Sequence, residues 1–141
     1  MILVDSETWV KAGIEFVDGV PRLSCVVTNS GYSDWSTQHW AQWDPKSEAT
    51  SIRIRVTKLL PGKEQGPSLV MEAAALTGDP ASTEGANWFQ VRIASLRSGD
   101  APWRMGLFSI SPIAQQGSCV RFYHLKIGAK QDLMHDMDAE A

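Results

Sequence analysis

Apolar and polar residues alternate along most of the chain, most clearly near its start. Between residues 8 and 17 an apolar side chain recurs at every second position: Val10, Ala12, Ile14 and Phe16. This is the period of a strand with one buried face. Asp18-Gly19 follows, a pair typical of a two-residue hairpin turn, and the alternation resumes with Leu23, Cys25 and Val27. The first thirty residues therefore predict a β-hairpin.

The same pattern continues to residue 127 and indicates an all-β protein. It predicts strands at residues 2–4, 8–17, 22–29, 34–38, 51–60, 67–76, 87–96, 104–111 and 118–127. Turn residues such as Pro61-Gly62 and Gly99-Asp100 lie between them. Many short strands at this spacing are typical of an antiparallel sandwich or barrel. We expect one domain over residues 1–128 and a disordered acidic tail over residues 129–141.

The apolar side of each strand predicts the core. Its expected members are Val10, Ala12, Ile14, Phe16, Leu23, Cys25, Val27, Ile52, Ile54, Val56, Phe89, Val91, Ile93 and Phe122. The two cysteines, Cys25 and Cys119, both lie in apolar strand patterns. Buried, reduced thiols are the expected state, and they favour a cytoplasmic location.

Composition narrows the classes of function. The 141 residues carry a net charge of −3, whereas a surface that binds nucleic acid needs an excess of Lys and Arg. No apolar run approaches the ~20 residues of a membrane span, and no basic and apolar leader pattern opens the sequence. We therefore expect neither a nucleic-acid partner nor a membrane partner.

Catalytic and metal-binding patterns are absent from the sequence. A retaining glycosidase needs two facing carboxylates, but Glu15 and Asp18 are three residues apart and straddle the expected turn. The three histidines have no cysteine or carboxylate at the spacing of a zinc site. We expect no catalytic residues, no metal and no cofactor.

Several segments resemble a family of domains of unknown function that are related to a fungal regulator of enolase expression. The resemblance is carried by Trp-Val-Lys-Ala-Gly-Ile-Glu-Phe at residues 9–16, Leu-Ser-Cys-Val-Val-Thr at 23–28 and Tyr-Ser-Asp-Trp-Ser at 32–36. Residues 52–56, 88–96, 105–112 and 120–122 resemble later strands of the family. The resemblance implies a concanavalin A-like jelly roll, an antiparallel sandwich of two sheets.

Two departures from that family bear on the interpretation. Members of the family usually carry several more strands before the segment at residues 9–16, so the resemblance implies a domain that lacks its N-terminal strands. Residues 61–85 are longer and richer in Gly, Pro and Ala than the corresponding hairpin. Strand edges that lack their partners recruit other chains, so we expect self-association or a protein partner.

A candidate ligand surface combines charged strand positions with an aromatic tip. Lys11, Glu15 and Arg55 lie on polar strand faces, and Tyr32, Asp34 and Trp35 form the tip. Aromatic rings beside a carboxylate suit a carbohydrate or a small metabolite. A solvated sheet face with cross-strand ion pairs is the other interpretation.

Two functions from different classes remain. The first is a non-catalytic binding or regulatory module, and the alternative is a glycan-active enzyme on the same fold.

Overall fold

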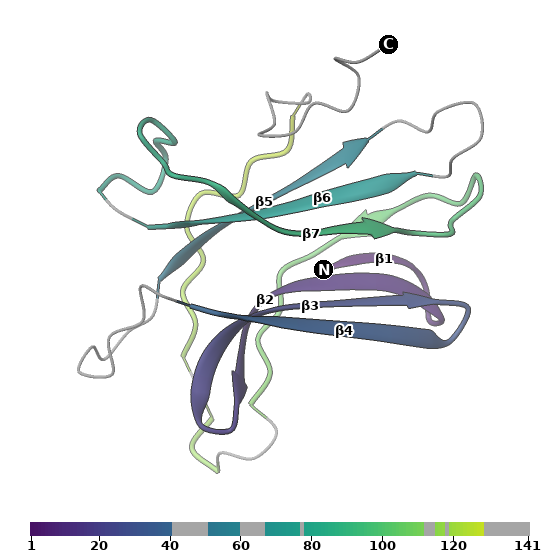
Figure 1. The fold of residues 1–141 in the computed structure, drawn as a ribbon, viewed down its shortest axis with the longest axis horizontal. Coiled ribbons are helices and arrows are strands. Elements are labelled where there is room, and N and C mark those ends of the chain that lie inside the picture. Colours follow the sequence, from purple (N-terminus) through teal and green to yellow (C-terminus); the bar gives the residue numbers. More distant parts are fainter. Residues whose placement is uncertain (41–50, 60–66, 77, 112–114, 118, 129–141) are drawn as a thin grey trace.

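In the computed structural model, the residues described are 1–40, 51–59, 67–76, 78–111, 115–117 and 119–128. The regular secondary structure in this part of the chain consists of β-strands alone, and they form two antiparallel sheets (Figure 1). This confirms the all-β sandwich. The part described contains no helix of the length and apolarity that a membrane crossing requires.

Sheet A has five strands in the order β4-β3-β2-β1-β8. Their bounds are β1 Ile2–Asp5, β2 Thr8–Val17, β3 Val20–Asn29, β4 Tyr32–His39 and β8 Arg104–Met105. The predicted turn joins β2 to β3, and Asp18 and Gly19 have φ angles of 53° and 79°. Glycine adopts such a positive φ without steric cost, so the Asp-Gly pair directs the chain back along itself.

Sheet B has three strands in the order β5-β6-β7, with bounds β5 Ile52–Leu59, β6 Ser68–Ala75 and β7 Phe89–Ser95. The core lies between the sheets, where Val10, Cys25 and Val27 of sheet A pack with Leu69 and Met71 of β6. A second cluster joins Leu23, Trp40 and Ala73.

The central strand β6 contributes more to the core than its sequence pattern suggested. Its residues 69–74 are all buried, including Glu72 at 1% exposure. A strand with a neighbour on each side and covered on both faces reads as a continuous apolar run without alternation. The expected core list, which followed alternation, therefore omitted β6.

Five expected core residues are exposed instead: Phe16, Ile54, Val56, Ile93 and Phe122, at 39–70%. Phe16 lies at the end of the β2–β3 hairpin, which extends away from sheet B (Figure 1). Ile54 and Val56 lie on β5, an edge strand with a neighbour on one side only. Phe122 lies in a segment that joins neither sheet.

A β-bulge explains Ile93. The register of β6 and β7 shifts between Met71 and Glu72, which leaves Val91 as an extra residue. A one-residue shift moves every following side chain to the other face. Arg92 and Ala94 therefore point to the core side, and Ile93 points away at 41% exposure.

The C-terminal strand predictions are wrong in extent. Of residues 104–111 only Arg104–Met105 form a strand, and the described part of 118–127 forms none. β8 pairs with β1, and this pairing ends where Gly106 N donates to Met1 O at 3.0 Å. Strand conformation is stabilised by a neighbouring strand, and residues 107–111 have no such partner among the residues described.

The cysteines differ from each other. Cys25 is fully buried, as expected, and burial raises the pKa of its thiol to about 11. Cys119 is exposed, contrary to expectation, because it lies in the C-terminal segment outside the sheets. Both are free thiols. The expected tail at residues 129–141 lies outside the residues described.

Candidate functional site

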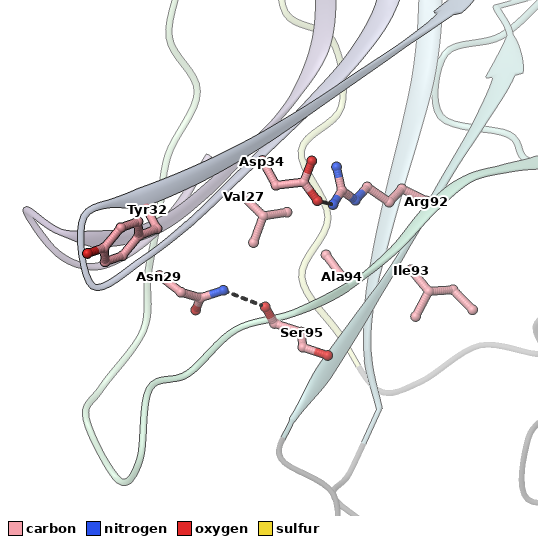
Figure 2. Close-up of a pocket in the computed structure, with 8 residues that line it drawn as sticks. All are labelled: Val27, Asn29, Tyr32, Asp34, Arg92, Ile93, Ala94 and Ser95. Atoms are coloured by element: carbon pink, nitrogen blue, oxygen red, sulfur yellow. Dashed lines mark hydrogen bonds and ion pairs between the residues drawn. The ribbon is translucent and has the colours of Figure 1, made fainter.

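The six candidate ligand residues lie on three separate surfaces. Lys11, Glu15 and Trp35 share the outer face of sheet A, because the register places Lys11 and Trp35 on either side of Val26. Arg55 lies on sheet B. Tyr32 and Asp34 line a cleft between the sheets (Figure 2). The single charged patch that the sequence suggested is therefore divided.

A hydrogen-bond network crosses the outer face of sheet A. Trp35 Nε1 donates to Ser24 Oγ at 2.9 Å, and Ser24 Oγ donates to Glu15 Oε2 at 2.6 Å. Lys11 Nζ donates to Glu15 Oε1 at 3.2 Å. The hydrogen bond from Ser24, with Lys11 beside it, holds the pKa of the Glu15 carboxyl below its ordinary value. The network fixes the Trp35 indole, which remains 54% exposed.

Arg55 is engaged in an ion pair on sheet B. Its Nε and Nη2 donate to the two carboxylate oxygens of Glu72 at 2.7 and 2.8 Å. Its guanidinium lies 4.4 Å from the centroid of the Trp88 ring. Because Glu72 is almost fully buried, its charge needs this partner. Arg55 therefore neutralises a buried carboxylate.

A cleft of about 320 Å³ lies where β3 and β4 of sheet A face β7 of sheet B (Figure 2). We call it the edge cleft. Its lining residues are Val27, Asn29, Tyr32, Asp34, Arg92, Ile93, Ala94 and Ser95. Arg92 Nη2 donates to Asp34 Oδ2, and Arg92 Nη1 donates to Ser36 Oγ at 3.2 Å. Asp34 and Arg92 thus form a cross-sheet ion pair in the cleft.

Two amide side chains join sheet A to the β7 edge on either side of this ion pair. Asn29 Nδ2 donates to the carbonyl of Ser95 at 3.1 Å, and Asn29 Oδ1 accepts from Arg97 N at 2.7 Å. Gln38 Nε2 donates to the carbonyl of Val91 at 2.6 Å. These bonds hold the two walls of the cleft at a fixed separation.

Sequence reasoning missed Arg92 and Asn29, and it did not foresee that Gln38 bonds to β7. Alternation placed Arg92 on the solvent side of its strand, and only the bulge turns it inward. A bulge depends on how two strands pair, so no local signal reveals it. The roles of Asn29 and Gln38 depend on β7, more than 50 residues along the chain.

The edge cleft combines an aromatic ring with a paired carboxylate and guanidinium. Asp34 is the only carboxylate among the lining residues that the structure describes, whereas retaining glycoside hydrolysis needs two about 5–5.5 Å apart. The described residues contain no group of three or more His, Cys, Asp or Glu side chains placed to hold a metal ion. Tyr32, which carries an aromatic ring, is 85% exposed, and the Asp34 side chain, which carries a carboxylate, is 74% exposed.

Comparison with known proteins gives a family and one relative. The family model described as "Protein of unknown function (DUF1349)" matches residues 1–130. A stretch of 37 residues is 57% identical to "Regulation of enolase protein 1" of Saccharomyces cerevisiae. That stretch covers 26% of this chain and 18% of the relative. No solved structure matches the chain.

Proposed function

The chain belongs to the DUF1349 family of unknown function, and from that premise we propose that it is a non-catalytic binding module whose edge cleft holds a small polyhydroxylated ligand. A family without an assigned activity leaves the site itself as the guide. The observation that carries the proposal is the meeting of Tyr32, Asp34 and Arg92 in one cleft.

Each of these side chains suits one part of a sugar. The exposed Tyr32 ring offers a flat apolar surface to the C–H face of a pyranose. The Asp34 carboxylate accepts hydrogen bonds from neighbouring hydroxyls, and its pairing with Arg92 fixes its orientation. The cleft volume of about 320 Å³ is near the lower end for small-molecule sites. A monosaccharide or a metabolite of similar size is therefore the best fit.

A regulatory role follows if binding changes how the module meets a partner. The yeast relative is named for regulation of enolase, and a sensor of a sugar or a metabolite is one form that such regulation takes. The free thiols Cys25 and Cys119 suit a reducing compartment, so we place this activity in the cytoplasm.

The alternative, a glycan-active enzyme, predicts turnover. The single carboxylate among the described lining residues of the edge cleft supports binding over hydrolysis. Incubating the purified chain with oligosaccharides and assaying reducing ends separates the two functions. Catalytic release of reducing sugar would establish the enzyme and overturn the binding module.

The binding test measures how substitutions of the cleft residues Tyr32 and Asp34 change the affinity for sugars. Glucose, mannose, galactose, N-acetylglucosamine and maltose are titrated into the chain by calorimetry, and at least one is expected to bind. Tyr32→Ala and Asp34→Asn are each expected to weaken that binding by at least about tenfold, which corresponds to about 1.4 kcal/mol.

Trp35→Ala is the matched control, because Trp35 lies on β4 with its side chain on the opposite face from Asp34. It is expected to leave affinity within about twofold. Loss of binding in Trp35→Ala but not in Tyr32→Ala would move the site to the outer face of sheet A. No binding of any of the five sugars would refute the proposal.

A further inference from the structure

We propose that the edge cleft selects a ligand that carries an ammonium group on its polyhydroxylated ring, that is, a protonated amino sugar. The inference rests on the proposed function, because it concerns the same cleft, and it names the class of sugar that the cleft prefers. The observation that carries it is the exposed carboxylate of Asp34, which is paired with the much less exposed guanidinium of Arg92.

The two charges of the cleft differ in their access to solvent. The Asp34 side chain is 74% exposed, whereas the Arg92 side chain is only 19% exposed. The guanidinium is also engaged within the protein, because Arg92 Nη2 donates to Asp34 Oδ2 and Nη1 donates to Ser36 Oγ at 3.2 Å. A ligand that enters the cleft from solvent therefore meets the negative charge more readily than the positive one.

Asp34 keeps the capacity to accept further hydrogen bonds. Among the residues that the structure describes, its carboxylate is bonded through Oδ2 to Arg92, and Oδ1 has no partner. An ionised carboxylate only accepts, and its two oxygens offer about four lone-pair sites. A hydrogen bond from a charged donor is roughly twice as strong as one from a neutral donor. An ammonium group, which combines three donors with a positive charge, is therefore the best complement to Oδ1.

The other polar lining residues leave this preference undisturbed. Both ends of the Asn29 amide are engaged, because Nδ2 donates to Ser95 O and Oδ1 accepts from Arg97 N. The hydroxyls of Tyr32 and Ser95 accept as well as donate, so they suit the hydroxyls of a sugar ring. Arg92 is the only cationic side chain among the lining residues that the structure describes.

The arrangement along β4 suits a single sugar ring. Tyr32 and Asp34 are two residues apart on this strand, so their side chains leave the same face about 7 Å apart. Arg92 bonds to Asp34 and to Ser36, the next residue on that face, and thus approaches Asp34 from the end away from Tyr32 (Figure 2). A ring stacked on Tyr32 can therefore direct an ammonium substituent to Asp34, and an aromatic face attracts a nearby cation.

An anionic sugar, such as a sugar phosphate, is the opposite case. Its partner would be Arg92, whose guanidinium is already paired with Asp34. The anion would have to displace that carboxylate or lie beside it, and like charges brought together in a binding site cost several kcal/mol. The expected order of affinity is therefore a cationic sugar first, a neutral sugar second and an anionic sugar last.

The test compares sugars that share one ring and differ in charge: glucosamine, glucose, N-acetylglucosamine and glucose 6-phosphate. Each is titrated into the wild-type chain by calorimetry, at low salt and at a pH that keeps the amine of glucosamine protonated. Glucosamine is expected to bind at least about threefold more tightly than either neutral sugar, which is within the range of a partly exposed ion pair. N-acetylglucosamine is the matched ligand, because it keeps the nitrogen substituent and lacks its charge.

Two variants assign the preference to Asp34. Asp34→Asn removes the charge and keeps the shape of the side chain, so glucosamine and glucose are expected to bind about equally, both more weakly than to the wild type. Asp18→Asn is the matched control, because it removes the same charge from the β2–β3 turn, at the end of β3 away from Tyr32. Asparagine tolerates the φ of 53° found there. This variant is expected to keep the wild-type preference.

The outcomes separate this inference from the proposed function. If glucose or N-acetylglucosamine binds as tightly as glucosamine, the inference is overturned and the sugar-binding module stands. Tighter binding of glucose 6-phosphate also overturns the inference, because the partner of the ligand would then be Arg92. So does a preference that survives Asp34→Asn or that Asp18→Asn removes. If none of the sugars binds, charged or neutral, both the inference and the proposed function are overturned.

Discussion

The two edges of sheet A differ in the contacts that they make with the rest of the protein. At one edge, β4 and its neighbour β3 are joined to β7 by the Asp34–Arg92 ion pair and by the amides of Asn29 and Gln38. At the other, β8 has only two residues, and the chain leaves the sheet after Gly106 (Figure 1). We call these the sealed edge and the open edge.

The difference shows how strand pairing in the sandwich depends on the separation of the paired strands along the chain. β2, β3 and β4 are consecutive hairpins, so each strand finds its partner across a short turn at little cost in loop entropy. β8 depends on β1, about 100 residues earlier in the chain. The sealed edge also has polar side chains that bond across the sheets. At the open edge, residues 105–110 offer backbone groups and side chains that are apolar except for Ser109.

The largest expected contrast is in cysteine reactivity, between the core of the sandwich and the C-terminal segment outside the sheets. Cys25 is buried with a thiol pKa of about 11, whereas Cys119 is exposed. In dilute native protein, an alkylating reagent should modify Cys119 at the rate of a free thiol. Cys25 should react at least about a thousandfold more slowly, because it must wait for unfolding. Mass spectrometry over time measures both rates, and equal rates would show that the core opens freely.

Core truncation gives the next contrast. Leu23 is 1% exposed between the sheets, so Leu23→Ala should cost about 2–5 kcal/mol in the free energy of unfolding. Phe122 is half exposed, so Phe122→Ala should change that free energy by about 0.5 kcal/mol or less. Urea unfolding of both variants measures the difference. A loss of several kcal/mol in Phe122→Ala would mean that the C-terminal segment is packed.

The contrast between local hairpins and long-range strand pairing also separates what the sequence could predict from what it could not. The hairpins over residues 8–39 were predictable because alternation and turn residues are local signals, and Asp18-Gly19 forms the turn where expected. The burial of Val10, Leu23, Cys25 and Val27 followed from the same signals. The strand at 104–111 also had the local pattern, but it needed a long-range partner, and among the described residues its pairing with β1 includes only Arg104 and Met105.

The candidate site was less predictable than the fold. Tyr32 and Asp34 were identified from their chemistry, and the structure places both in the edge cleft. Arg55 was grouped with them because it is polar and on a strand, yet it pairs with a buried Glu72 that no periodicity reveals. Arg92 enters the cleft through a bulge. Which charged strand residues meet is decided by strand order and register across the two sheets.

Removing the hydrogen bond of the Gln38 amide tests whether side-chain amides stabilise the sealed edge. Gln38→Ala leaves the Val91 carbonyl without its donor at 2.6 Å, which should cost about 0.5–1.5 kcal/mol. Thr37→Ala is the control on the same strand, because Thr37 is exposed on the outer face, and should stay within about 0.5 kcal/mol. Chemical denaturation measures both. Equal losses would assign the effect to strand propensity and not to the seal.

Acid titration should give the smallest effect, and it should act on the hairpins but not on the open edge. Hydrogen bonding from Ser24 and the charge of Lys11 lower the pKa of Glu15 in the folded state. A lowered folded pKa means that the contribution to stability is complete above the ordinary value of 4.5 and is lost as the pH falls through the folded pKa.

Because Glu15 is about one-third exposed, that contribution should be about 1 kcal/mol or less. Glu15→Gln should therefore be slightly less stable than the wild type at neutral pH, and the difference should shrink as the pH falls below 4.5. Residues 105–110 carry no ionisable side chain, so the open edge should contribute nothing to this pH dependence. Urea midpoints of the wild type and of Glu15→Gln, measured across this pH range, give the difference. A difference that stays constant as the pH falls through this range would contradict a lowered pKa of Glu15 in the folded state.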